Sequence, residues 1–238
     1  MIQALLFDIN GTVTDILTDE SRPEIYRTLS NFLDYRGIKI PPEVIQTRYF
    51  ELIRHQKEHS LENYPEFDAI RVFYDLLVEH GHHGEANLLA PILSDLFRAV
   101  SRLKLEPYPG VRELLPELEK NYQLAAVSDG QVSWTLAELR SIGIIQYFHP
   151  VVISGDYGFR KPDRRMFGMA LMDLNLPAES AVFIGNDTHR DIYGAHQTGM
   201  RTIFFESNQG DHAPHGVDPD YVIHDFRELP QALARLNR

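Results

Sequence analysis

Short apolar runs recur along the chain, and most of them contain no polar residue. They occupy residues 4–7, 124–127, 151–153, 181–184, 202–205 and 221–223. A strand that is buried on both faces needs apolar side chains at consecutive positions, whereas a half-exposed strand alternates. These runs therefore predict the strands of a parallel sheet that is covered on both sides.

Helical patterns fall between these runs in the second half of the chain. Apolar residues at helical spacing predict helices over residues 111–118, 132–141, 162–174 and 191–198. Strands that alternate with helices are typical of a doubly wound α/β fold, in which helices cover both faces of the sheet. We expect this core to include residues 1–15 and 107–238.

The stretch from residue 16 to residue 106 breaks this rhythm, because it is rich in helical patterns and poor in strand-like runs. One helix would begin at Pro23 and end before Gly37, and another would follow Pro41-Pro42. Further helices are expected over residues 67–79 and 85–103. The sequence thus predicts a helical domain inserted over residues 16–106.

Composition narrows the classes of function. The 238 residues include 23 Lys and Arg against 34 Asp and Glu, a net charge of −11, and no Cys. Such a surface argues against sequence-independent binding to nucleic acid, although a local cation can still favour a phosphorylated ligand within one pocket. The absence of Cys excludes a thiol nucleophile and a Cys-ligated metal.

No segment of the sequence reads as a signal peptide or a membrane span. The N-terminus has no basic region, and no apolar run approaches the roughly 20 residues that a bilayer requires. We therefore expect a soluble, cytoplasmic protein with no membrane partner. The sequence is compatible with either a monomer or a homodimer.

Polar residues with useful chemistry follow two of the predicted strands in the motifs Asp8-Ile9-Asn10-Gly11-Thr12 and Ser128-Asp129-Gly130. Asp8 would end a buried strand, where a carboxylate is costly without a partner, and Gly11 would allow a sharp turn. The Ser128 hydroxyl could donate to a phosphate oxygen, with Gly130 leaving room for it. Each motif taken alone also fits an ordinary polar turn.

Two further motifs complete the candidate site. Lys161, in the segment 158–163, could place its ammonium between Asp8 and a bound phosphate; it could equally be a surface residue before a helix. Asp187 and Asp191, which follow the strand at 181–184, could lie on one face of a helical turn as oxygen ligands for Mg²⁺. The alternative role for this pair is a helix N-cap with favourable dipole charges.

Together these motifs resemble the haloacid dehalogenase superfamily of aspartate-nucleophile hydrolases. The resemblance runs in order through residues 8–12, Ser128, 160–163 and 185–191, and it extends to the helix and strand that follow. It implies a Rossmann-like core and identifies the helical insert with the family's cap domain.

The resemblance also implies a role for each motif. Asp8 would attack phosphorus and form an aspartyl-phosphate, and the substrate would be a small phosphorylated metabolite. A Mg²⁺ ion would be held by Asp8, the backbone carbonyl of Asn10 and Asp187, with Asp191 supporting the site. The transferred group would be bound by Ser128, Lys161 and backbone amides around Gly11 and Thr12.

Two positions depart from the family pattern. Phosphatases of this family usually have Asp where this chain has Asn10, and an amide cannot exchange a proton with the leaving group. Loss of acid–base catalysis typically lowers a rate by about 10²–10⁴, so we expect slow turnover that favours aryl or acyl phosphates. Asp129 replaces a more usual Asn and could select a cationic or hydroxylated substrate.

Asn10 leaves two alternative functions open. The first is a metal-independent 2-haloacid dehalogenase, although such enzymes usually have small neutral residues where this chain has Asp187. The second is a non-catalytic sensor that binds a phosphorylated metabolite and signals through closure of the cap.

Overall fold

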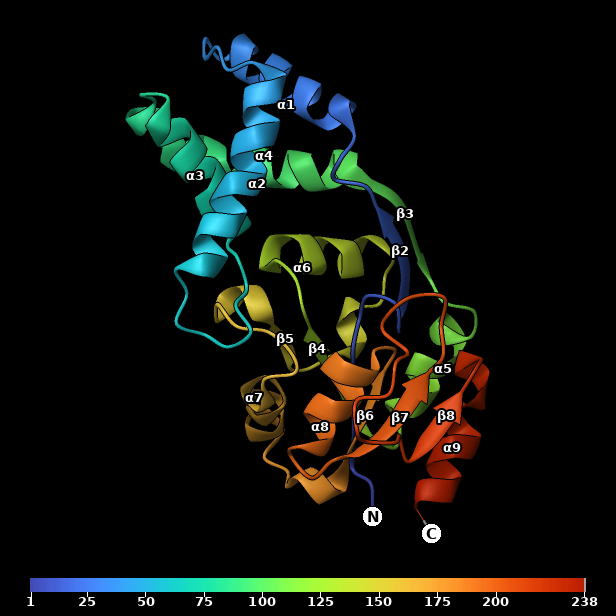
Figure 1. Cartoon of the computed structure of the whole chain (residues 1–238). Coiled ribbons are helices and arrows are strands. Elements are labelled where there is room, and N and C mark those ends of the chain that lie inside the picture. Colours follow the sequence, from blue (N-terminus) through green and yellow to red (C-terminus); the bar gives the residue numbers. More distant parts are fainter. Residues whose placement is uncertain (238) are drawn as a thin grey trace. The chain divides into compact units, whose positions relative to one another are not determined.

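The computed structural model describes residues 1–237, which form two compact units (Figure 1). The α/β unit consists of Met1–Ile16 and the chain from Leu105 onward, and the helical unit consists of Leu17–Lys104. The first boundary lies one residue after the predicted one, and the second lies two residues before it.

Six strands form the sheet of the α/β unit, in the order β5-β4-β1-β6-β7-β8. Every neighbouring pair is parallel, which confirms the predicted doubly wound α/β fold. Strand β1 lies between β4 and β6, with Phe7 in register with Ala126 on one side and Ile184 on the other. The bounds of the strands are β1 (Ala4–Phe7), β4 (Gln123–Ser128), β5 (Val151–Ile153), β6 (Ala181–Gly185), β7 (Arg201–Phe205) and β8 (Tyr221–Ile223).

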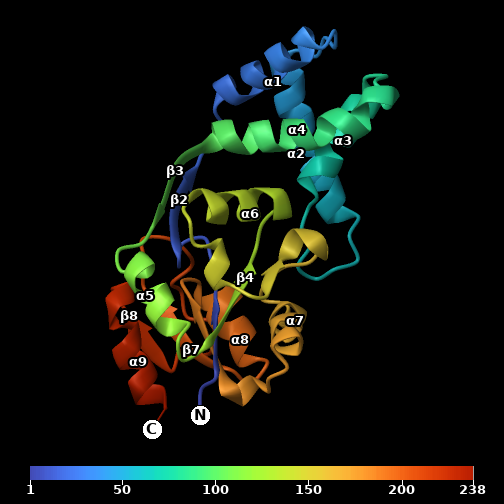
Figure 2. The ribbon, with the colours of Figure 1, turned by 180° about the vertical axis from the view of Figure 1, so that it is seen from behind.

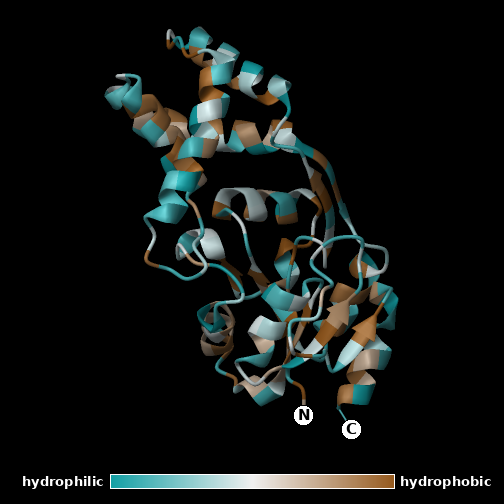
Figure 3. Cartoon of the chain, in the orientation of Figure 1, coloured by the Kyte–Doolittle hydropathy of each residue, from teal (hydrophilic) through white to brown (hydrophobic). Residues whose placement is uncertain are grey.

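Both faces of this sheet are covered, which explains why its strands are apolar at consecutive positions. Leu5 and Phe7 pack into one cluster with residues of α5, α6 and α9, whereas Ala4 and Leu6 pack into another with residues of α7 and α8. Figure 2 shows α5 and α9 apart from α7 and α8, and Figure 3 shows the hydrophobic strands between them. The bounds of these helices are α5 (Val111–Leu118), α6 (Val132–Ser141), α7 (Arg164–Leu174), α8 (Gly194–His196) and α9 (Leu229–Leu236).

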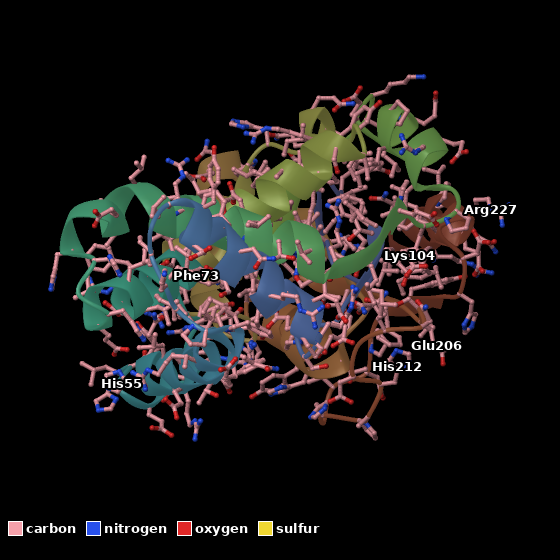
Figure 4. All side chains as sticks on the ribbon, turned by 90° about the horizontal axis from the view of Figure 1, so that it is seen from above. His55, Phe73, Lys104, Glu206, His212 and Arg227 are labelled. Carbon is pink, nitrogen blue, oxygen red and sulfur yellow. The ribbon has the colours of Figure 1, made fainter. Side chains whose placement is uncertain are left out.

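The helical unit packs around four aromatic side chains, one from each of its helices. Tyr26, Tyr49, Phe73 and Phe97 come from α1, α2, α3 and α4 in turn, and all four are buried (Phe73 is labelled in Figure 4). The rings of Tyr49 and Phe97 are 4.3 Å apart between centroids, and Tyr49 also lies 5.6 Å from Phe73. Aromatic burial of this kind gives the unit a core of its own. The helices are α1 (Pro23–Tyr35), α2 (Pro42–Glu58), α3 (Ala69–Glu79) and α4 (His83–Ser101).

The structure differs from the predicted elements where the chain passes between the units. Strands β2 (Thr14–Thr18) and β3 (Arg102–Pro107) form a two-stranded sheet, so the helix expected over residues 85–103 ends at Ser101. The last part of that pattern, Leu103 and Leu105 separated by Lys104, alternates as a strand does. None of the helices in residues 1–237 is both long and apolar enough to cross a membrane.

Helix boundaries near the candidate site also differ from the prediction. Helix α7 begins at Arg164 because the side chain of Asp163 caps it by accepting from the amide of Arg165. The expected helix over residues 191–198 instead begins as a π-helical turn, Thr188–Tyr193, that continues into α8. Asp187 is the N-cap of this π turn.

Candidate active site

The candidate residues come from the carboxyl ends of three adjacent strands. Asp8 directly follows β1, Ser128 is the last residue of β4, and Asn186 directly follows β6. Because β4 and β6 pair with β1 on its two sides, these strand ends meet at one edge of the sheet. Lys161 joins them from the segment that precedes α7.

Lys161 is the centre of a buried network of charges. Its Nζ lies 2.6 Å from Oδ1 of Asp8 and 2.7 Å from Oδ1 of Asp191, and all three side chains are almost inaccessible to solvent. Burial opposes a charged amine, but the carboxylates of Asp191 and Asp8 outweigh it and raise the pKa of Lys161. The ammonium is therefore fixed beside the expected nucleophile.

Asp191 supports this network from the side remote from Asp8. Burial raises its pKa to about 7, although Lys161 favours the charged form. Its second oxygen, Oδ2, accepts from the backbone amides of Asn186 and Asp187, each at 3.1 Å. Asp191 thus positions both Lys161 and the turn after β6.

The turn after β1 brings Thr12 against the expected nucleophile. The hydroxyl of Thr12 lies 3.1 Å from Oδ2 of Asp8 and 3.0 Å from Oδ1 of Asn186. Gly11 has a φ of +91°, and a Cβ added there would come within 2.3 Å of Nδ2 of Asn186. Glycine is required at this position both for the backbone conformation and for the space that Asn186 occupies.

Asn10 lies at the edge of the same turn and is half-buried. Its Oδ1 accepts from the Thr14 hydroxyl at 3.3 Å. The backbone of this segment closes tightly, since the Gly11 amide donates to the Thr14 carbonyl at 2.8 Å. The side chain of Asn10, two positions after Asp8 in the sequence, is therefore held by the hydroxyl of Thr14.

Asp187 acts as a helix N-cap in this structure. Its Oδ1 accepts from the amides of His189 and Arg190, at 3.1 and 2.7 Å. Its Oδ2 accepts from Nε of Arg190 at 2.8 Å and from the amide of Asp211 at 3.1 Å. Burial raises the pKa of a carboxyl, but the backbone and side chain of Arg190 and the amide of Asp211 outweigh it, so the pKa of Asp187 is lowered.

These contacts test whether the predicted metal ligands fit a divalent cation. Both oxygens of Asp187 already accept from two donors each, and both oxygens of Asp191 are held by Lys161 and backbone amides. The set of Asp8, Asn10, Asp187 and Asp191 therefore does not fit Mg²⁺ in this arrangement.

Asp129 comes to lie beside Lys161 and Arg190. Its Oδ1 accepts from the amide of Lys161 at 3.0 Å, and its Oδ2, 3.7 Å from Nη1 of Arg190, makes no hydrogen bond within the described chain. Burial raises its pKa, although Lys161 and Arg190 oppose the shift. Asp129 thus lies beside Lys161 and Arg190 with one oxygen that makes no hydrogen bond within the described chain, and its role in substrate binding stays a prediction.

Ser128 and Gly130 have different surroundings. Ser128 is fully buried, and its hydroxyl lies 3.5 Å from the carbonyl of Asp129. The amide of Gly130 donates to the hydroxyl of Ser154 at 2.9 Å, which ties this turn to the segment after β5. Gly130 therefore has a structural role in the turn, whereas Ser128 stands at the strand end with Asp8 and Asn186.

The sequence patterns assigned no role to Asn186 or Arg190. Asn186 is 1% exposed and contacts Thr12, and its Nδ2 makes no hydrogen bond within the described chain. Arg190 contacts both Asp187 and Asp129. The position of Asn186 directly after a buried strand was a usable signal, but no sequence pattern placed Arg190 across the site.

A loop after β7 covers the turn after β6. The amide of Thr188 donates to the carbonyl of Asp211 at 2.8 Å, and the amide of Asp211 donates to Asp187. Gly210 has a φ of +91°, and a Cβ added there would come within 2.2 Å of the Asn186 carbonyl. His212, labelled in Figure 4, belongs to this loop.

Several known proteins are similar to this chain in sequence or in fold. The family model described as haloacid dehalogenase-like hydrolase matches residues 5–205. A glyceraldehyde 3-phosphate phosphatase of Methanopyrus kandleri is 30% identical over 243 residues that cover 99% of both chains. A phosphoserine phosphatase of Thermus thermophilus is 30% identical over 160 residues, covering 67% of this chain and 62% of the other. A solved 2-haloacid dehalogenase from Pseudomonas syringae is 26% identical, covers 99% of both chains and superposes with a TM-score of 0.72.

Proposed function

The chain belongs to the haloacid dehalogenase-like hydrolases, and from this premise we propose that it removes a phosphoryl group from a small metabolite through a covalent intermediate on Asp8. The observation that carries the proposal is the position of Asp8 at the end of β1, buried, with the ammonium of Lys161 at 2.6 Å. A carboxylate held in this way is oriented for attack, and the ammonium reduces its repulsion of an incoming anion.

The chemistry requires two displacements at phosphorus. In the first, an oxygen of Asp8 forms a bond to phosphorus while the bond to the leaving oxygen breaks. Asn10 cannot supply a proton to that leaving oxygen. The leaving group therefore departs as an anion and takes its proton from solvent. In the second, water attacks phosphorus, releases phosphate and regenerates Asp8.

Names of the relatives support a small phosphate monoester as the substrate class. Glyceraldehyde 3-phosphate and phosphoserine are both three-carbon phosphate monoesters, and the chains named for them align with 99% and 67% of this one. We propose substrates of this size. The proposed substrate partner is a small molecule, while a monomeric or homodimeric state and a cytoplasmic location stay predictions.

Phosphatases of this family generally use a divalent metal, and the resemblance implies Mg²⁺. Because the oxygens of Asp187 and Asp191 already accept from donors, the proposed displacements use only the side chains of this chain and water. We propose that Lys161, Thr12 and Ser128 hold the phosphoryl group; the contacts of Lys161 and Thr12 with Asp8, and the place of Ser128 at the end of β4, support this.

The test is a screen of phosphate monoesters for release of inorganic phosphate, followed by acid quenching and mass spectrometry of the protein. We expect turnover, and a phosphorylated peptide that contains Asp8. Asp8→Asn should abolish both signals, whereas Asp173→Asn, which changes an exposed aspartate on α7, should leave both intact. Phosphate release that survives Asp8→Asn would refute the proposal, and tight binding without release would favour a sensor.

One observation favours a second candidate, a 2-haloacid dehalogenase. Asp187, which as a metal ligand would favour a phosphatase, is a helix N-cap here, and a solved 2-haloacid dehalogenase superposes with a TM-score of 0.72. In that reaction Asp8 would displace halide from carbon, and water would cleave the resulting ester. Release of chloride from a 2-chloro acid in EDTA, together with no phosphate release from any monoester, would establish this alternative.

A further inference from the structure

Arg190 lies across the end of the central strand of the sheet. Its Nε and Nη2 are each 2.8 Å from Oδ2 of Asp187, which follows β6, and its Nη1 is 3.7 Å from Oδ2 of Asp129, which follows β4. Strands β6 and β4 are the two neighbours of β1. Because Arg190 contacts both Asp187 and Asp129, its guanidinium lies near the end of β1, the strand that Asp8 directly follows.

This guanidinium takes up the carboxylate that a metal would need. Asp187 has no free lone pair to offer a metal. Its Oδ2 accepts from Arg190 and from the amide of Asp211, and its Oδ1 accepts from two amides. A planar guanidinium matches a carboxylate or a phosphoryl group in geometry and stays charged at every working pH. Arg190 is therefore a permanent positive charge in this part of the site.

The side chain that faces Thr12 and Gly11 is Asn186, which is neutral. It contacts the Thr12 hydroxyl at 3.0 Å, and that hydroxyl also contacts Asp8. Whichever way its amide is turned, Asn186 adds no negative charge to attract a divalent cation. Asp187, the carboxylate that follows Asn186, could serve as a second carboxylate ligand only if its pair with Arg190 were broken.

We propose that Arg190 is a built-in cation of the phosphoryl-binding site, and that the site binds phosphate without a divalent metal. The proposal rests on the proposed function, since it assigns the charge that neutralises the transferred group. The guanidinium of Arg190 would donate hydrogen bonds to phosphoryl oxygens near the end of β1. The ammonium of Lys161, which contacts Asp8, would supply a second positive charge. Such charge-assisted hydrogen bonds are among the stronger ones that proteins make.

The test measures binding of inorganic phosphate by calorimetry, in EDTA and in Mg²⁺. We expect wild-type dissociation constants that agree within about twofold in the two buffers. Arg190→Met should weaken binding by at least about tenfold in both, and Arg190→Lys should restore part of it. Arg165→Gln is the matched control, because Arg165 also pairs with an aspartate but is exposed on α7, and it should bind as wild type does.

A second measurement addresses the metal directly. Titration of Mn²⁺ followed by electron paramagnetic resonance should show no stoichiometric site in the wild type. If Arg190→Met unfolds, the double variant Asp187→Asn/Arg190→Met, which removes both members of the pair, provides the phosphate measurement in its place.

The outcomes separate the two proposals. Phosphate binding that requires Mg²⁺, a tight Mn²⁺ site that depends on Asp187, or wild-type affinity in Arg190→Met would each overturn the role of Arg190 and leave the phosphatase proposal standing. If phosphate binds in neither buffer and no monoester is hydrolysed, the proposed function fails, and the built-in cation for a phosphoryl group fails with it.

Discussion

Nζ of Lys161 lies 2.6 Å from Oδ1 of Asp8, although 153 positions separate the two residues in the chain. Both side chains are buried, and the same ammonium reaches Asp191 at 2.7 Å. Removal of one member of a buried ion pair leaves a charge without compensation, which typically costs about 3–5 kcal/mol.

Replacement of this lysine should therefore affect both stability and activity. We predict that Lys161→Met lowers the free energy of unfolding by about 3–5 kcal/mol and reduces turnover by more than about 100-fold. Urea unfolding and steady-state kinetics measure the two effects. Adding Asp191→Asn removes one of the buried charges that Lys161→Met leaves unpaired, so the double variant should recover part of the stability but none of the activity. An unfolding midpoint equal to that of the wild type in Lys161→Met would contradict this prediction.

We predict that Asn10 determines which leaving groups the protein can use. Oδ1 of Asn10 accepts from the Thr14 hydroxyl, and a carboxylate oxygen can accept the same bond, so Asn10→Asp should fold normally. We expect it to accelerate hydrolysis of alkyl phosphates by about 10²–10⁴, because it introduces a group that can exchange a proton, and to change acyl phosphates much less. The measurement is kcat for a matched pair of alkyl and acyl phosphates. Equal rates for this pair in the wild type would rule out the role assigned to Asn10.

Acid stability should depend on Asp187. The pKa of Asp187 is lowered below its ordinary value of 3.8 in the folded protein, since hydrogen bonds from Arg190 outweigh burial. A carboxyl with a depressed folded pKa contributes stability that is complete above its unfolded pKa and is lost as pH falls through the folded value. We predict that Asp187→Asn lowers the midpoint of thermal unfolding at pH 7 and shrinks that difference below about pH 4. A difference that stays constant from pH 7 to pH 3 would speak against this account.

The loop after β7 offers a comparison between two glycines. Gly210 has a φ of +91° and no room for a Cβ, which would lie 2.2 Å from the Asn186 carbonyl, whereas Gly216 has a φ of +79° and open space. Gly216→Ala should cost about 1–2 kcal/mol from backbone strain alone. Gly210→Ala should cost roughly 1–3 kcal/mol more, because a backbone carbonyl cannot move aside. Urea unfolding of both variants tests this prediction. Equal losses in the free energy of unfolding would show that the loop at Gly210 does not pack tightly against Asn186.

Much of the fold could be predicted from hydrophobic pattern. The runs at residues 4–7 and 181–184 are apolar at every position because alternate side chains enter the two clusters on opposite faces of the sheet. Local pattern failed at residues 102 and 103, where the end of a predicted helix gives way to β3. Strand pairing with β2 decides that segment, and its partner lies more than 80 residues earlier in the chain.

The candidate site was predictable in part. Asp8, Ser128 and Asp129 follow from their positions at strand ends, since parallel neighbours bring those ends together. Lys161, which lies in the segment before α7, was identified through the family resemblance. The role of Asp187 was not predictable, because a carboxylate that follows a strand can either cap a helix or hold a metal. The sequence is compatible with both roles. Arg190 decides between them through contacts to Asp187 and Asp129.

By itself, the sequence determined the parallel sheet, the helical insert and the strand ends that carry polar residues, because each depends on which side chains are apolar over a few consecutive positions. Only the tertiary structure decided which of those polar side chains face one another. Asn186 contacts Thr12, and Asp187, which caps the π-helical turn at Thr188–Tyr193, contacts Arg190. The contact of Asn186 with Thr12 joins residues 174 positions apart, and no local pattern encodes that placement.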